Sequence, residues 1–164
     1  MVIILLFYFL ALLQNSFFTH FNLLGSVPNL VFILFFLLVF FEKKKKNYLI
    51  IPLAIVAGLF LDIFSYTYIG PSIVLLIIIG IVLKKIQSLL KNREDNYPFV
   101  YFLPLFLICF AVYEALLMIS LHFFDLSHTL INFDLRFAAG IVYSLFFAII
   151  GFWIFKKHAK KIQN

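Results

Sequence analysis

The chain has 164 residues, of which 65% are hydrophobic and only 12% are charged. Its mean hydropathy is +1.14, and a soluble domain of this length could not remove that much apolar surface from water. Runs such as "LVFILFFLLVFF" do not alternate polar and apolar residues as the strands of a membrane barrel do. Because lipid offers no hydrogen bonds to the backbone, the spanning segments must then be helices. The sequence predicts an all-α polytopic integral membrane protein.

Six apolar segments follow one another along the chain and are joined by short connections. The first lacks a basic n-region and an A-x-A-like site, so it is expected to be a retained helix and not a signal peptide. The second is the weakest, because its apolar core is short for a bilayer about 30 Å thick, although Pro28 suits a first helical turn. One membrane domain over 1–164 is expected, with helices at about 2–18, 28–41, 48–64, 70–86, 98–121 and 136–155.

The basic residues predict the orientation. Twelve of the thirteen fall on one face, and only Arg136 falls on the other. By the positive-inside rule that face is cytoplasmic, so a chain of six transmembrane helices has both termini in the cytoplasm. If the second segment were re-entrant, a five-helix chain with its N-terminus outside would keep the same charges inside. The residues on the basic face are Lys43, Lys44, Lys45, Lys46, Lys84, Lys85, Lys91, Arg93, Lys156, Lys157, Lys160 and Lys161.

The net charge of +6 does not require a nucleic acid partner. A "KKKK" tract beside a helix is usually a topology determinant, and it attracts anionic lipid by about 1 kcal/mol per residue. The expected partner of these lysines is therefore membrane lipid. The 24 phenylalanines, with the abundant Ile, Lys and Asn, are interpreted as codon bias of an A+T-rich genome.

Two acids lie inside apolar segments. Asp62 falls near the outer end of the third segment, and Glu114 falls well inside the fifth. An acid near the centre of a spanning helix costs a few kcal/mol, so such residues usually face protein or water. A packed, hydrogen-bonded interior site is the first expectation for both, and contact with a partner or ligand is the second. An ion or proton path would more often show several ionisable groups or broken helices.

Neither catalysis, a cofactor nor a metal is expected. No nucleophile with a base, glycine-rich phosphate loop or pair of catalytic carboxylates is present, which argues against an enzyme. The single Cys109 is expected to be a buried or lipid-facing thiol. A zinc site needs three or four converging ligands, whereas the loop residues His20, His122, His128, Asp125 and Asp134 show no sign of convergence.

Small residues predict close helix contacts in two segments. Ala54 and Gly58 are four residues apart on one face of the third segment, with Ala57 beside them. Close backbone approach at small residues drives helix packing in lipid. Ala139 and Gly140 are candidates for the same role in the sixth segment.

Several stretches, in order, resemble the family of the rod shape-determining membrane protein MreD. They are "LLQNSFF", then "GSVPNLVFILFFLLVF", and then, after a basic loop, "AIVAGLFLDIFSYTYIGPSIVLL". The last is similar to the family's signature, in which a small-residue helix ends in Gly-x-x-x-Asp before a short loop and a glycine. The resemblance covers about residues 10–85 and departs from the family at Asn29, where aspartate is common, and in an aromatic loop, "SYTYIG".

This resemblance implies a non-catalytic component of the bacterial cell-elongation machinery in the inner membrane. It would bind the bitopic coiled-coil protein MreC and, through it, influence the wall polymerase and transpeptidase pair and the actin-like filament. Asp62 would then hold the outer end of the third helix against the loop to Gly70. The motif residues carried over are Pro28, Asn29, Ala54, Gly58, Asp62 and Gly70.

The alternative comes from a different class. The six-helix layout also resembles the substrate-binding components of energy-coupling-factor vitamin transporters, which hold a small ligand between helices and outer loops. Asp62, Glu114, Asn132 and Arg136 could contribute to such a pocket but are too few to specify one. A membrane scaffold or carrier of another kind is the third possibility.

Overall fold

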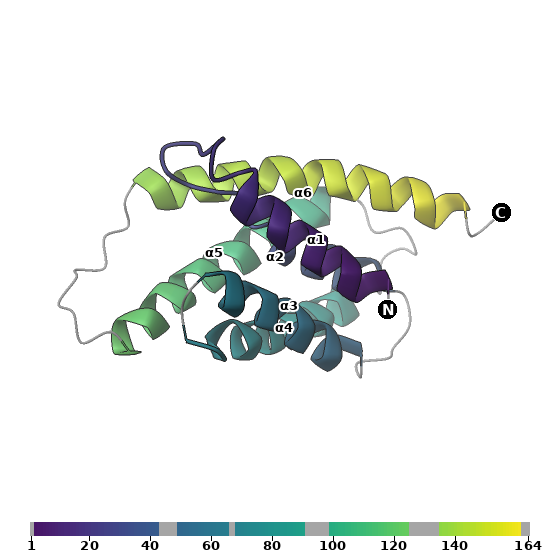
Figure 1. Ribbon diagram of the computed structural model, residues 1–164. Coiled ribbons are helices and arrows are strands. Elements are labelled where there is room, and N and C mark those ends of the chain that lie inside the picture. The colour runs from purple at the N-terminus through teal and green to yellow at the C-terminus, as the bar shows by residue number, and fades with distance from the viewer. Residues whose placement is uncertain (1, 43–48, 66–67, 91–98, 125–134, 162–164) are drawn as a thin grey trace.

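The computed structural model describes residues 2–42, 49–65, 68–90, 99–124 and 135–161 (Figure 1). These residues form six α-helices, one in each of the six predicted segments, and the prediction of an all-helical chain is confirmed. In chain order they are α1 (Val2–Ser16), α2 (Leu30–Phe41), α3 (Ile50–Phe64), α4 (Pro71–Leu90), α5 (Phe99–Phe124) and α6 (Leu135–Lys161).

The helices differ in length. Only α4, α5 and α6, within the described residues, are long and apolar enough to cross a membrane by themselves, over Pro71–Leu89, Phe99–Ser120 and Leu135–Lys157. The other three helices, α1, α2 and α3, are also apolar but are shorter. At 1.5 Å per residue, the 12 residues of α2 extend about 18 Å, well short of a hydrocarbon layer of about 30 Å. The chain has the helices of a membrane protein, whereas six crossings and cytoplasmic termini stay predictions.

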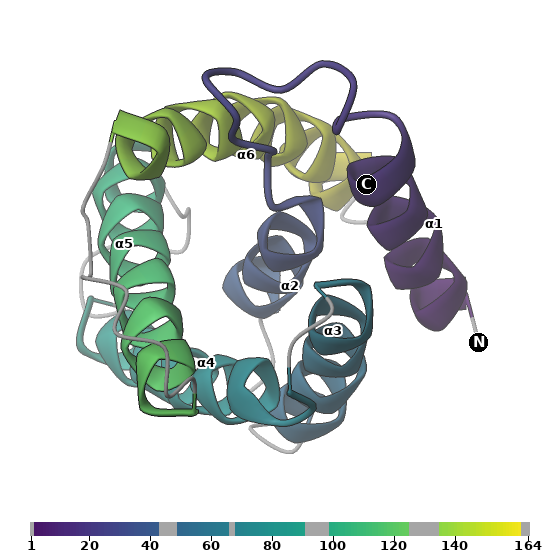
Figure 2. The same cartoon turned by 60° about the vertical axis from the view of Figure 1, so that its left-hand side comes forward.

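The short helix α2 lies at the centre of the bundle. Viewed nearly along its axis, it is surrounded by the other helices (Figure 2). All of its residues except Leu38 and Phe41 are buried. A helix that is apolar on every side requires apolar neighbours on every side. Protein and not lipid therefore covers most of α2, so its length need not match the bilayer.

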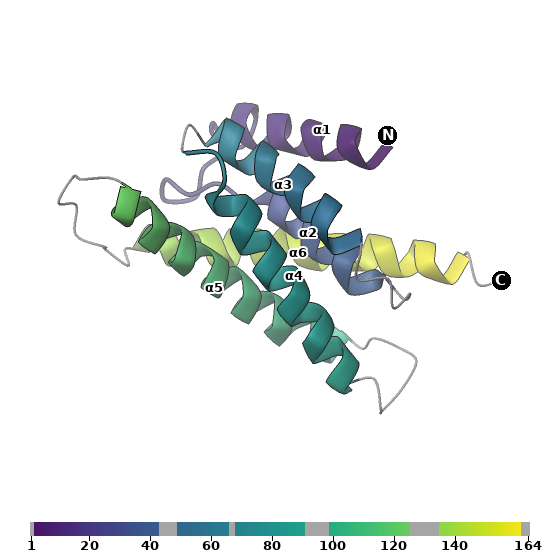
Figure 3. The same ribbon diagram turned by 90° about the horizontal axis from the view of Figure 1, so that it is seen from below.

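Successive helices run in opposite directions. The start of α1 and the end of α6 lie at the same end of the bundle (Figures 1 and 3). We call this the inner end, following the orientation that the lysines predict. The opposite end, at which α2, α4 and α6 begin, is called the outer end.

Phenylalanine rings fill the space between α2 and α5. Three rings four residues apart on α2 meet three on α5, and within each row successive ring centroids lie 5.7–6.3 Å apart. Between the rows the rings meet edge to face at 5.1–6.0 Å, an arrangement that aromatic quadrupoles favour. These phenylalanines have a packing role, whatever the codon usage. They are Phe32, Phe36 and Phe40 on α2, and Phe102, Phe106 and Phe110 on α5.

Helices α3 and α4 pack most closely, side by side (Figure 3). Ala54 and Ala57 are fully buried in α3. A Cβ atom placed on Gly58 would lie only 2.6 Å from the backbone N and Cα of Ile73 in α4. The predicted close contact at the small residues of the third segment is therefore present, and glycine at 58 is required by the neighbouring backbone.

Candidate functional site

Asp62 joins the end of α3 to the start of α4 at the outer end. Its side chain is only 1% exposed. The backbone N–H of Gly70 donates to Oδ2 at 2.7 Å, and that of Ser72 donates to Oδ1 at 3.2 Å. The first N–H groups of a helix have no partner within the helix, and a carboxylate there is favoured by the helix dipole. Asp62 therefore caps α4, and the contact expected between Asp62 and the loop to Gly70 is present.

The backbone at this corner depends on two residues beside the carboxylate. Gly70 has φ +130°, a backbone conformation that residues other than glycine rarely adopt. Pro71 begins α4, where its missing N–H costs nothing. The loop thus turns at Gly70 and presents the N–H groups of Gly70 and Ser72 to Asp62. We call Asp62, Gly70 and Ser72 the outer corner.

A buried chain of polar groups leads from the outer corner to the centre of the bundle. The hydroxyl of Tyr113, on α5, donates to Oγ of Ser72 at 3.2 Å. Tyr113 is 1% exposed, and its hydroxyl also lies near the side chain of Asn29. The side chain of Asn29 in turn lies near the Glu114 carboxyl group. The two acids singled out in the sequence are therefore ends of one polar network, whose links are Ser72, Tyr113 and Asn29.

Asn29 is the N-cap of α2. Its Oδ1 accepts from the backbone N–H of Phe32 at 3.0 Å, and its own N–H donates to Oγ of Ser144, on α6, at 3.0 Å. The next N–H, of Leu30, donates to Oε1 of Gln14, on α1, at 3.0 Å. Side chains thus satisfy the N–H groups that a buried helix start would otherwise leave unpaired. Through these contacts the network includes residues of all six helices.

Two small pockets flank the network. One, of about 180 Å³, has Glu114 and Arg136 in its wall. The other, of about 110 Å³, is bounded by Gln14, Asn29, Tyr113 and other residues. Ligand pockets for drug-sized molecules are larger, at roughly 300–1,000 Å³. These pockets fit only a small group.

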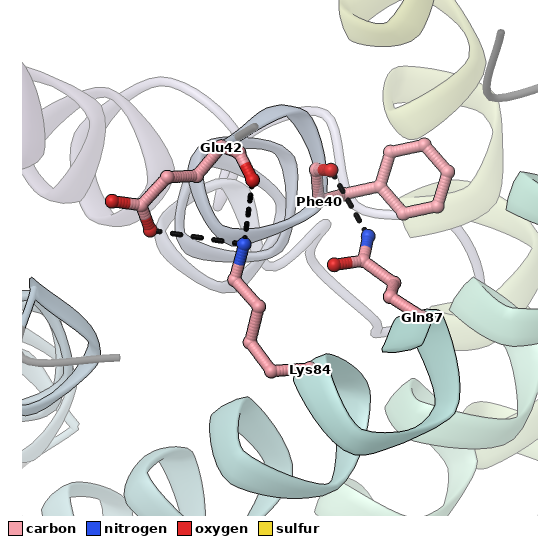
Figure 4. A network of polar contacts seen from close by, with 4 residues as sticks. All are labelled: Phe40, Glu42, Lys84 and Gln87. Atoms are coloured by element: carbon pink, nitrogen blue, oxygen red, sulfur yellow. Dashed lines mark hydrogen bonds and ion pairs between the residues drawn. The ribbon is translucent and has the colours of Figure 1, made fainter. Parts of the chain in front are cut away.

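The inner end of α2 is held by α4 (Figure 4). Nζ of Lys84 donates to the backbone oxygen of Glu42 at 2.7 Å and lies 3.8 Å from its Oε2. Nε2 of Gln87 donates to the backbone oxygen of Phe40 at 3.0 Å. The last carbonyl groups of a helix lack partners within it, and α4 supplies them here. Lys84, predicted only as a topology determinant, also caps α2.

The remaining predicted residues do not join the outer network. Pro28 is buried but lies before the N-cap Asn29, two positions ahead of the first residue of α2 and not in its first turn. Ala54 is buried in α3. Lys85 and Lys157 are exposed, whereas Nζ of Lys156 lies 5.6 Å from the ring centre of Trp153, a cation–π contact. Lys43, Lys44, Lys45 and Lys46 lie outside the described residues.

No group of three potential metal ligands gathers in the part of the chain that the structure describes. His20 is exposed there. The placement of Asp125, His128, Asn132 and Asp134, and the side chain of His122, lie outside that part.

Sequence reasoning missed four members of the network: Gln14, Ser72, Tyr113 and Ser144. Each is a polar side chain in or beside an apolar segment, and this position alone could have indicated a buried polar contact. Their pairing joins helices far apart in the chain, with Asn29 and Ser144 separated by 115 positions, so spacing could not reveal it.

Searches of curated protein sequences and of solved structures gave no significant match. The model of the family described as rod shape-determining protein MreD matches residues 1–161. That match includes the helix α3, the loop and the start of α4 that form the outer corner, and it extends beyond the stretch in which the motifs were recognised. The chain belongs to the MreD family of rod shape-determining proteins.

Proposed function

We propose that this protein is a non-catalytic, multi-pass component of the cell-elongation machinery in the bacterial inner membrane. It binds an MreC-like bitopic protein and thereby helps to organise the peptidoglycan polymerase and transpeptidase, with the actin-like filament linked indirectly. Membership of the MreD family over residues 1–161 supports this role. The lysines near the inner end fit an orientation in which the outer end faces the periplasm.

The structure of the outer corner is the main support for this proposal. Asp62 accepts two backbone hydrogen bonds there, and hydrogen bonds to a charged group are worth about 1.5–3 kcal/mol each. Immediately before Gly70, the side chains of Tyr68 and Ile69 are 59% and 68% exposed. Side chains on a backbone that Asp62 already orders lose less conformational entropy when a partner binds, so they offer a favourable contact surface. The partner binds these residues at the end where its periplasmic part begins.

The first test removes the acceptor at the outer corner. Asp62→Leu keeps an apolar helix end and leaves the N–H groups of Gly70 and Ser72 without their carboxylate. We expect normal membrane insertion and a loss of at least about tenfold in the MreC-like protein recovered with the tagged variant. Each lost hydrogen bond is worth more than about 1.4 kcal/mol, and the partner must then supply this energy to order the loop on binding. Lys157→Gln, at an exposed inner-end residue, is the matched control. Equal recovery with Asp62→Leu and the control would overturn the proposal.

A second variant separates the contact from the fold. Ile69→Ser changes an exposed side chain and leaves every hydrogen bond of Asp62 in place. We expect reduced recovery of the partner with an unchanged unfolding temperature in detergent. Full recovery would show that the loop is not the contact surface.

Neither of the two pockets in the described residues supports the vitamin-transporter alternative. The pockets described above are too small for a vitamin-sized ligand. The same purification also tests this alternative, since such a protein would be recovered with ATPase subunits and a transmembrane coupling protein.

A further inference from the structure

The larger pocket lies between the outer halves of α5 and α6. Phe110, Glu114 and Met118 line it from α5 at four-residue intervals, which places them on one helix face. Arg136, Phe137 and Gly140 line it from the first turns of α6. The two helices diverge toward their outer ends (Figure 1). The pocket therefore lies where the bundle widens, beside the start of α2.

The pocket carries one acid and one base that do not meet. Glu114 and Arg136 both line it, but no ion pair joins them; in the part of the chain that the structure describes, ion pairing is seen between Lys84 and Glu42. Glu114 is partly buried within α5, where a charge without an opposite partner is costly, whereas Arg136 is exposed at the outer side of the pocket. A ligand that carries both signs would satisfy both side chains at once.

We propose that this pocket binds a small zwitterion that carries a primary ammonium and an anionic phosphate or carboxylate. The ammonium pairs with the Glu114 carboxylate, and the anionic group pairs with the Arg136 guanidinium, whose planar fork suits two oxygens. Arg136 is in the first turn of α6, so the anionic group lies at the outer entrance and the ammonium points inward. The volume of about 180 Å³ admits a small polar group of this kind and excludes a vitamin-sized one.

Occupancy of the pocket is linked to the centre of the fold. The Glu114 carboxyl group lies near the side chain of Asn29, the N-cap of α2. On the other side, Oγ of Ser26, which also lines the pocket, donates to the backbone oxygen of Arg136. A bound zwitterion fixes both charged side chains, and through them the start of α2 and the start of α6. Binding to the folded state alone then raises the unfolding temperature.

Two sources supply this chemistry: the phosphoethanolamine headgroup of a membrane lipid, and a free zwitterion in the periplasm. The test measures thermal unfolding of the full chain in nanodiscs of phosphatidylethanolamine or phosphatidylcholine, and in phosphatidylcholine nanodiscs with added phosphoethanolamine or glycine. We expect a rise of at least about 3 °C with a primary-ammonium ligand. A rise in the lipid arm alone identifies a headgroup, and a rise with the soluble compounds identifies a free ligand.

The variants assign the effect to the pocket. Glu114→Gln and Arg136→Gln should each abolish the rise, whereas Lys85→Gln, at an exposed residue near the inner end, should keep it. If either pocket variant fails to fold, binding of labelled phosphoethanolamine to the unaltered protein, with unlabelled phosphocholine as competitor, replaces this arm. No rise or binding, equal responses to choline and ethanolamine compounds, or a response that survives Glu114→Gln would overturn the proposal. None of these results depends on whether an MreC-like partner is recovered.

Discussion

The α2–α5 and α3–α4 interfaces use opposite means to hold helices together in an apolar environment. Between α2 and α5, six phenylalanine rings occupy the space. Between α3 and α4, Gly58 lets the backbones approach until no Cβ fits. In lipid no hydrophobic gain accompanies helix association, so packing supplies the energy in both cases. The first interface should be sensitive to lost volume, and the second to added volume.

The largest effect is expected from a ring deleted between α2 and α5. Phe106 is fully buried and contacts Phe32 and Phe36 on α2. Phe106→Ala should lower the free energy of unfolding by about 3–5 kcal/mol, because the surrounding rings cannot collapse into the space. Denaturant unfolding in mild detergent measures this. Phe146→Ala, which shortens a 59% exposed ring on α6, is the control, and a similar loss in both would refute the special role of the rings.

A smaller effect is expected from one methyl group added between α3 and α4. Gly58→Ala places a Cβ 2.6 Å from the Ile73 backbone, so the helices must separate. We expect a cost of about 1–3 kcal/mol in the same unfolding assay. A stabilised Gly58→Ala protein would contradict the close approach of these two helices.

The smallest effect is expected at a glycine of α6 that the sequence grouped with Gly58. A Cβ on Gly140 would meet Ser26 at 3.8 Å, an ordinary contact. Gly140→Ala should therefore change stability by less than about 1 kcal/mol, and in the stabilising direction, because alanine favours the helix. Comparing the unfolding midpoints of Gly140→Ala and Gly58→Ala sharpens the contrast. A loss as large as that of Gly58→Ala would show that α6 is packed more tightly than the distances indicate.

Local features of the sequence predicted the parts of the structure that depend on neighbouring residues. Unbroken apolar runs predicted six helices, and the spacing of Ala54 and Gly58 predicted a close interface. The resemblance to the MreD family implied a contact between Asp62 and the loop to Gly70, eight positions further on, and the hydrogen bond is present. In each case the relevant residues lie on one helix or on two helices joined by a short loop.

Features that depend on distant residues could not be predicted. In the sequence, Lys84 is one of several lysines on the basic face. It caps the end of α2 only because α2 and α4 lie side by side in the fold. Likewise, no local pattern links Asn29 to Glu114, although their side chains lie close together in the fold. Hydropathy alone does not explain why the second segment is so short. The structure does: other helices surround α2, so it need not be long enough to cross the bilayer.

A crosslinking measurement in cells tests whether Asp62 holds the outer loop in place for a bitopic partner. A photo-crosslinking amino acid replaces Ile69, which is 68% exposed, in the otherwise unaltered protein and in Asp62→Leu. We expect a crosslink from position 69 to an MreC-like protein, and its loss in Asp62→Leu at equal protein level. A crosslink of equal strength in both, or none in either while the complex is still recovered, would contradict this expectation.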